Sequence, residues 1–110
     1  MITQRHNLNV VPDKVLPIVY ASQLDTARKI EFQLYKENTE YTPDATSVYA
    51  TIDGERIEAE VSGSIVSFVL PESVTRDSGT KLGEVVLEYD GKIATCNFKL
   101  KVMPTYLPNA

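Results

Sequence analysis

The stretch from residue 83 to residue 102, GEVVLEYDGKIATCNFKLKV, contains two alternating apolar and polar runs joined by Asp90-Gly91. A two-residue turn of this composition is the strongest local signal for a β-hairpin, because Asp and Gly tolerate the positive φ that both turn positions require. The turn sets a register that pairs Leu87 with Ala94 and Val85 with Cys96 on one face. That face is apolar and the other is mostly polar, so the rest of the chain must supply a second layer to cover it.

A second hairpin is predicted over residues 47–61, with its turn at Asp53-Gly54. Its register pairs Ala50 with Ile57 and Val48 with Ala59, so that apolar residues again lie opposite apolar residues. The two hairpins therefore obey one rule of alternation.

Further strands are predicted over residues 27–35 and 65–70, and Pro17 restricts the run 15–21 to an edge strand or a strand that switches sheets. Seven or eight short strands without an amphipathic helix predict an all-β, antiparallel β-sandwich of immunoglobulin-like or Greek-key type, with a jelly roll as the alternative. The alternation predicts a set of interior residues: Ile30, Phe32, Leu34, Val48, Ala50, Ile57, Val66, Phe68, Val85, Leu87, Cys96, Phe98 and Leu100.

The chain of 110 residues is long enough for one domain with one core. We expect the sandwich to span residues 1–102, with residues 1–14 as an N-terminal arm or edge strand. Residues 103–110 contain two prolines and no periodicity, which is typical of an extended linker.

The composition excludes several classes of function. A net charge of −4 without clustered Lys and Arg argues against nucleic acid as a partner. No apolar stretch reaches the ~18 residues of a membrane helix and no signal-peptide core is present, so we expect synthesis in a cytoplasm and no membrane partner. The single cysteine, Cys96, excludes an internal disulfide and fits the interior of the last strand.

Catalytic and metal sites are not expected. The one histidine, His6, lies in the N-terminal segment, and Cys96 has no second cysteine with which to bind a metal. A nucleophilic mechanism needs a base held beside a Ser, Thr or Cys, which this pattern does not provide. Glu58 and Glu60 share a strand face and are best interpreted as a solvated surface. We therefore predict that the chain is not an enzyme and takes no cofactor.

Six tyrosines occur without any tryptophan. Tyr49 is predicted on the outer face of its strand, and Tyr41 and Tyr106 fall in irregular segments. Together with Arg5 and His6 near the N-terminus, these tyrosines are the candidate residues of a protein interface, although ordinary packing of tyrosine on a sheet explains them equally well.

The first half of the chain carries a series of short segments, VLPIV (15–19), QLDTAR (23–28) and YTPDA (41–45). A strand with Val66, Phe68 and Leu70 follows, and the last hairpin closes with GKIATCNF (91–98). In order and spacing, this series resembles the N-terminal domain of phage baseplate upper proteins (BppU). The resemblance spans nearly the whole chain.

The resemblance implies a β-sandwich at the N-terminus of a longer, usually trimeric, fibre-like protein. In that family the domain attaches the fibre to the virion, distal parts recognise the host, and the domain has no catalytic activity. For this chain it implies a homotrimer in the virion, in contact with baseplate hub or capsid proteins, with residues 103–110 leading to a missing C-terminal fibre. Attachment to the tail baseplate or to the capsid head stays open. The alternative is a carbohydrate-binding or immunoglobulin-like adhesion module.

Overall fold

The structure is a computed structural model that describes residues 1–12 and 15–106. Its secondary structure is almost entirely β, with one short helix after the eighth strand. The elements are β1 (Ile2–Asn9), β2 (Ile18–Ser22), β3 (Arg28–Lys36), β4 (Thr39–Glu40), β5 (Ser47–Ile52), β6 (Glu55–Glu58), β7 (Glu60–Ser62), β8 (Ile65–Val69), α1 (Glu72–Thr75), β9 (Gly79–Tyr89) and β10 (Lys92–Met103).

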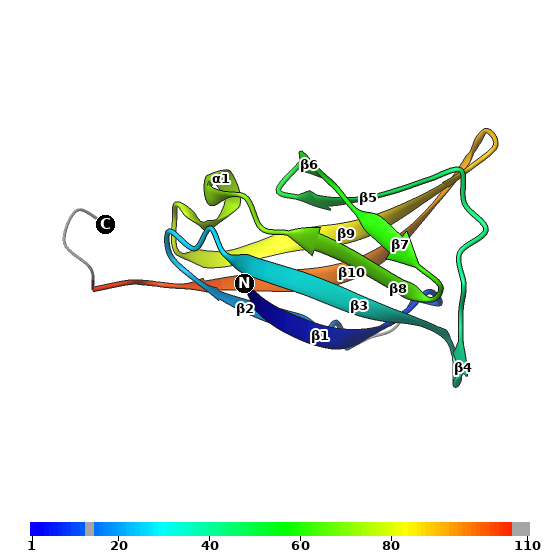
Figure 1. The fold of residues 1–110 in the computed structure, drawn as a ribbon, viewed down its shortest axis with the longest axis horizontal. Helices are drawn as coiled ribbons and strands as arrows, with labels where there is room; N and C mark the ends of the chain where they lie inside the picture. The colour runs from blue at the N-terminus through cyan, green and yellow to red at the C-terminus, as the bar shows by residue number, and fades with distance from the viewer. Residues whose placement is uncertain (13–14, 107–110) are drawn as a thin grey trace.

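Two sheets face each other across the core (Figure 1). The first, which we call the β3 sheet, has the order β1-β3-β8-β7, with β4 paired to β3. The second, the β9 sheet, has the order β2-β10-β9-β5-β6. This arrangement confirms the predicted all-β sandwich, and the order β3-β8-β7 opposite β10-β9-β5 is the order of an immunoglobulin-type sandwich.

The sheets are mixed, whereas the sequence predicts antiparallel pairing throughout. β1 runs parallel to β3, and β2 runs parallel to β10. The reason is that the chain leaves β1, reverses into β2 at the edge of the other sheet, and reverses again into β3. Two reversals bring β3 back to the direction of β1. The prediction that the run containing Pro17 forms an edge strand or switches sheets is confirmed, because β2 is the edge of the β9 sheet.

The register of the last hairpin is as predicted, with Leu87 opposite Ala94 and Val85 opposite Cys96. In the other hairpin Ala50 lies opposite Ile57, but the pairing of Val48 with Ala59 is wrong. β6 ends at Glu58, and the chain crosses at Ala59 to form β7 in the β3 sheet. The crossing gives β8 a second partner strand, which a continued β6 could not supply.

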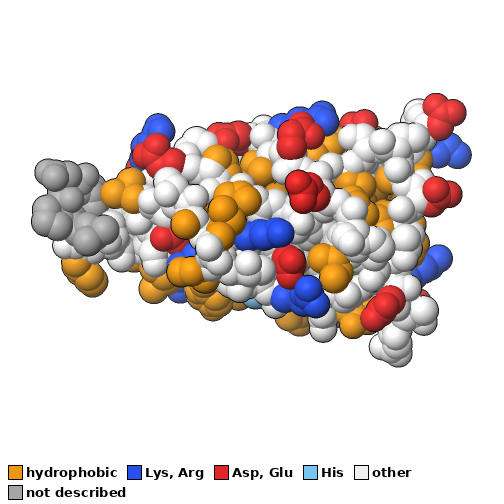
Figure 2. Space-filling model, viewed as in Figure 1, with side chains coloured by type: hydrophobic (Ala, Val, Ile, Leu, Met, Phe, Trp, Pro, Cys, Tyr) orange, Lys and Arg blue, Asp and Glu red, His pale blue; other side chains and the backbone are white. Residues whose placement is uncertain are grey.

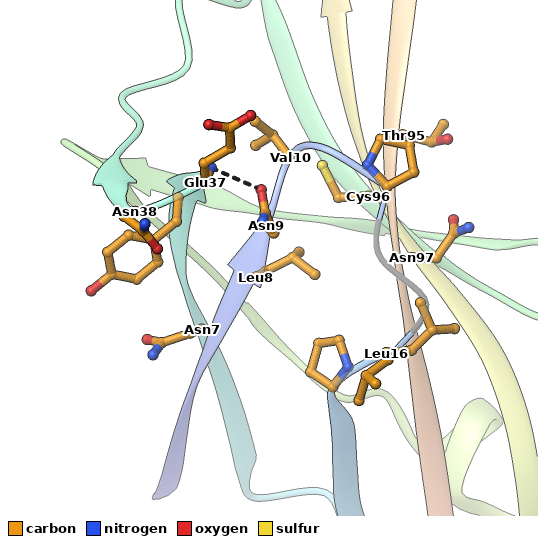
Figure 3. Close-up of a pocket in the computed structure, with 14 residues that line it drawn as sticks. Asn7, Leu8, Asn9, Val10, Leu16, Glu37, Asn38, Thr95, Cys96 and Asn97 are labelled. Carbon is orange, nitrogen blue, oxygen red and sulfur yellow. Dashed lines mark hydrogen bonds between the residues drawn. The ribbon is translucent and has the colours of Figure 1, made fainter.

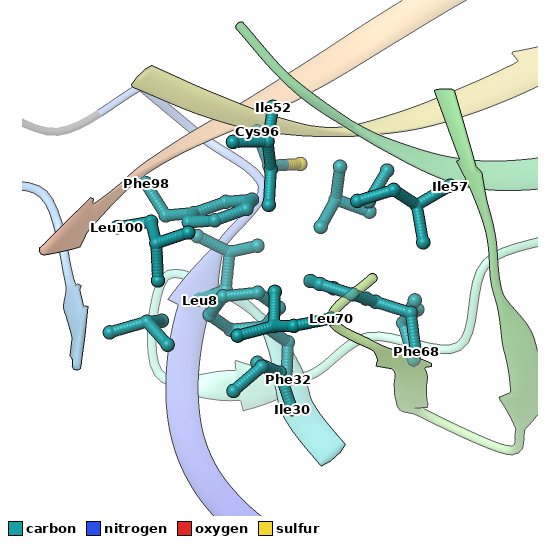
Figure 4. Packing of buried hydrophobic residues seen from close by; sticks show 14 of the residues in the cluster. Leu8, Ile30, Phe32, Ile52, Ile57, Phe68, Leu70, Cys96, Phe98 and Leu100 are labelled. Atoms are coloured by element: carbon teal, nitrogen blue, oxygen red, sulfur yellow. The ribbon is translucent and has the colours of Figure 1, made fainter. Parts of the chain in front are cut away.

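The core lies between the sheets, and every residue predicted to be interior is buried except Val48, which is half-buried at the margin. Three aromatic rings fill its centre (Figure 4). The Phe32 and Phe98 ring centroids are 4.9 Å apart, and the Phe68 centroid is 6.1 Å from each. At the centre of the core, rings from β3 and β8 of one sheet therefore meet a ring from β10 of the other.

The two ends of the chain differ from the prediction in detail. Residues 2–9 form β1, an edge strand of the β3 sheet. β10 continues one residue past the predicted boundary, to Met103, and residues 104–106 are irregular. Residues 13–14 of the predicted N-terminal segment and 107–110 of the predicted linker lie outside the described residues.

Candidate interaction surfaces

Arg5 and His6 are neighbours on β1 and point to opposite faces. Arg5 lies on the outer face, where its Nη2 is 2.9 Å from Oε1 of Glu31 in an exposed ion pair. The ring of His6 is half-buried, with its centroid 6.1 Å from that of Phe32, and its Nε2 is 3.2 Å from Oε1 of Gln4. Burial lowers the pKa of His6. Only Arg5 is therefore presented to a partner on the outer face.

Tyr41 is a packing residue and not a free contact. Its hydroxyl is 2.7 Å from the hydroxyl of Tyr89, and both rings pack against the core. Burial and this hydrogen bond raise the pKa of Tyr89 to about 12. The pair holds the segment after β4 against the end of β9.

Tyr49 lies on the outer face of the β9 sheet, as the alternation predicts. Its hydroxyl donates to Oε1 of Glu88 at 3.0 Å, and the guanidinium of Arg56 lies 3.8 Å above its ring. The hydrogen bond to Glu88 raises the pKa of Tyr49. Arg56 also contacts Glu58 at 2.8 Å, so the ring belongs to a cross-strand cluster on β5, β6 and β9.

Tyr106 follows β10 and is 97% exposed. The five predicted interface residues are thus dispersed over the domain. Arg5 and Tyr49 lie on the outer faces of the two sheets, and His6 packs inward from β1. Tyr41 packs against the end of β9, and Tyr106 follows the last strand. The structure brings none of the three candidate tyrosines together with another.

A cavity that the sequence did not indicate opens at the side of the sandwich, with a volume of about 500 Å³ (Figure 3). Its walls come from the end of β1, the end of β3, β10 and the described residues of the β1–β2 connection. The Asn9 side chain orders one wall, because its Oδ1 accepts from the backbone N–H of Val11 at 3.0 Å and of Glu37 at 3.2 Å. No local sequence signal marks this cavity, because three segments far apart in the chain form it.

The chemistry of the cavity is that of amides, with Asn7, Asn38 and Asn97 at its walls and one carboxylate, Glu37. Cys96 also lines it, and burial raises the pKa of this thiol to about 11, so the thiol is protonated at neutral pH. The described residues that line the cavity include no His, Lys or Arg. The cavity offers hydrogen bonds and apolar contact to a ligand.

Within residues 1–12 and 15–106, no group of three or more His, Cys, Asp or Glu side chains is gathered where a metal ion could be held. The helix in the described part of the chain is too short and too polar to span a membrane.

No family model matches the chain, and no curated protein matches it. Nine chains of solved structure match it by fold. One of them is the N-terminal domain of ORF48 of phage TP901-1, with a TM-score of 0.69 and 8% sequence identity. The match covers 94% of this chain and 99% of that chain. The chain therefore has the fold of a phage N-terminal domain over nearly its whole length.

Proposed function

We propose that this chain is a structural domain of a tailed bacteriophage particle. It attaches a trimeric fibre or baseplate protein to the tail baseplate or the capsid head, and so supports host recognition by the distal parts. The observation that carries the proposal is the match over 94% of this chain to the N-terminal domain of ORF48 of phage TP901-1. The resemblance of segments such as YTPDA (41–45) to baseplate upper proteins supports the same assignment.

The partners under this proposal are other virion proteins, either the baseplate hub or capsid proteins, and two sister chains of a homotrimer. The protein is made in the host cytoplasm and acts in the virion. The net charge of −4 supports protein partners over nucleic acid.

The proposal also assigns no catalytic activity to the domain. The two side chains best suited to catalysis are Cys96 and His6. Burial raises the pKa of the Cys96 thiol to about 11, and the His6 ring contacts Phe32 and Gln4. Under this proposal, the function of the domain is to attach the fibre or baseplate protein to the particle through its surface.

The test is incorporation into particles. In a phage carrying this gene, particles made without residues 1–106 are expected to lack the protein, and adding the isolated domain during assembly is expected to block incorporation of the full-length protein. Mass spectrometry and electron microscopy of purified particles measure both. A protein that is absent from wild-type particles, or that enters them without residues 1–106, contradicts the proposal.

The carbohydrate-binding alternative has less support, because the most suitable ring is already occupied. Arg56 covers one face of Tyr49, and Glu88 binds its hydroxyl. A glycan array with the wild-type domain and Tyr49→Ala tests this alternative. Binding that Tyr49→Ala abolishes favours it over virion attachment.

A further inference from the structure

The sandwich has two lateral edges, and each consists of one edge strand from each sheet (Figure 1). On one side β1 and β2 lie together, since the backbone N–H of Tyr20 donates to Oε1 of Gln4 at 3.4 Å and the Gln4 amide donates to the Tyr20 carbonyl. On the other side β6 continues through Ala59 into β7. We call the first the β1/β2 edge, including the outward-facing Lys99, Lys101 and Met103 of β10. We call residues 55–62 the β6/β7 edge.

The β1/β2 edge is cationic. β1, β2 and β10 contain no Asp or Glu. Lys99 lies beside Ile18 in the register of the sheet, and Lys101 lies beside Tyr20, so both ammonium groups project from the outer face next to the edge. Neither lysine forms an ion pair with any residue that the structure describes. These two charges are available to a partner.

The β6/β7 edge is acidic. It carries Glu55, Glu58 and Glu60, all exposed, against one cation, Arg56. Arg56 pairs with Glu58 at 2.8 Å, and the Ser73 hydroxyl donates to Glu55. Glu60 has no ion pair within residues 1–12 and 15–106. The two edges of one molecule therefore carry opposite charge.

Both edges also expose apolar side chains and unpaired strand backbone. On the β1/β2 edge Ile18 is 42% exposed and Tyr20 48%, and on the β6/β7 edge Val61 is 42% exposed. Figure 2 shows hydrophobic side chains along the lower border, over β1 and β2, and acidic side chains in the upper part, over β6 and β7. An exposed edge strand is a template for a further strand. Each edge thus has exposed apolar side chains, a row of backbone groups and a net charge, and the two net charges are opposite in sign.

We propose that the β1/β2 edge of one copy of this domain docks on the β6/β7 edge of the next copy. Lys99 and Lys101, on the outer face of the β9 sheet, then lie toward Glu58 on the outer face of β6 of the next copy. The contact is heterologous, because each copy uses two different surfaces, and such contacts build cyclic assemblies when the rotation closes. The inference takes only the number of copies from the proposed homotrimer. The pairing of the two edges does not depend on the proposed role in the virion.

Charge reversal on each edge tests the contact. Sedimentation velocity of the wild-type domain at up to about 1 mM, the range of weak association, is expected to show association that falls as salt rises. Lys99→Glu/Lys101→Glu and Glu58→Lys/Glu60→Lys are each expected to weaken it by at least about tenfold, since like charges then meet. The matched controls, Lys36→Glu/Lys92→Glu and Glu40→Lys/Asp44→Lys, lie off both edges and are expected to associate as the wild type does.

Mixing the two edge variants separates a heterologous contact from a symmetric one. The lysine variant keeps a wild-type β6/β7 edge and the glutamate variant keeps a wild-type β1/β2 edge, so the mixture is expected to associate although neither variant does alone. A wild-type domain that stays monomeric, an edge variant that associates normally, or a mixture that does not associate overturns the proposal. A domain that is monomeric but still enters particles contradicts the edge-to-edge contact and leaves virion attachment standing. A trimer that never enters particles contradicts virion attachment and leaves the edge-to-edge contact standing.

Discussion

At the scale of single residues, Gly83 is fixed by the ring opposite to it. Gly83 pairs with Phe98 across β9 and β10, and a Cβ on Gly83 would lie 2.4 Å from two atoms of that buried ring. Phe98 also contacts the rings of Phe32 and Phe68, so it has no room to retreat. We expect Gly83→Ala to lower the free energy of unfolding by about 1–3 kcal/mol, as overpacking does, measured by urea denaturation.

A smaller side chain at position 98 tests whether the Phe98 ring causes the loss of stability in Gly83→Ala. Phe98→Leu alone is expected to destabilise the domain by removing ring contacts. The double variant Gly83→Ala/Phe98→Leu is expected to be less destabilised than the sum of the two changes. Additive effects would mean that the ring is not what the new methyl group meets.

His6 gives the stability a pH dependence. Burial lowers its pKa in the folded state below the usual 6.5, so the unfolded chain binds the proton first as the pH falls. The neutral ring is present in both states above the unfolded pKa, and stability is lost as the pH falls from there toward the folded pKa. We expect urea denaturation between about pH 7 and pH 5 to show a steeper loss for the wild type than for His6→Gln. Equal slopes would contradict this.

At the scale of elements, the segment after β4 is held to β9 by two hydroxyl groups. Tyr41→Phe and Tyr89→Phe each remove the 2.7 Å hydrogen bond, which we expect to cost about 1 kcal/mol of stability. The pKa of Tyr89, about 12 in the wild type, is expected to move toward its ordinary value in Tyr41→Phe, because the hydrogen bond is one of its causes. Absorbance titration of tyrosinate measures this, and an unchanged titration curve would show that burial alone sets the value.

Local elements are predictable from this sequence and remote pairings are not. Asp90-Gly91 fixes its hairpin because the turn and both strands lie within one stretch of chain. No turn in the sequence predicts the parallel pairing of β1 with β3 or of β2 with β10. The break at Ala59 is invisible because Glu58, Ala59 and Glu60 continue the alternation without a Gly or Pro. Of the candidate interface, alternation placed Tyr49 correctly on the outer face, but it could not show that Arg56 and Glu88 already engage it.

At the scale of the whole molecule, the pattern of buried and exposed positions carries the fold more than residue identity does. A TM-score of 0.69 at 8% identity to the phage domain shows how few identities the sandwich needs. The N-terminal segment belongs to that pattern, because Leu8 is buried in the core and β1 covers the edge of β3.

Deletion of residues 1–10 is therefore expected to lower the melting temperature, since it removes Leu8 and exposes the edge of β3. Arg5→Ala is the matched control, because its exposed ion pair with Glu31 contributes at most about 1 kcal/mol. Calorimetry of both variants checks this. A deletion as stable as Arg5→Ala would show that β1 is dispensable to the fold, and any loss of particle binding on deletion would then report a lost contact.

The parallel pairing of β2 with β10 also sets the order of events on the ribosome. Val19 and Ala21 are buried beside Leu100 and Val102, so β2 has no neighbour in its sheet until the last strand has been synthesised. β1 can join β3 as soon as β3 has emerged. Translation therefore supplies all strands of the β3 sheet first, and β2 gains its neighbour only when residues 99–103 have left the exit tunnel. In a nascent chain that ends before residue 99, all strands of the β3 sheet are present but β2 has no strand to join.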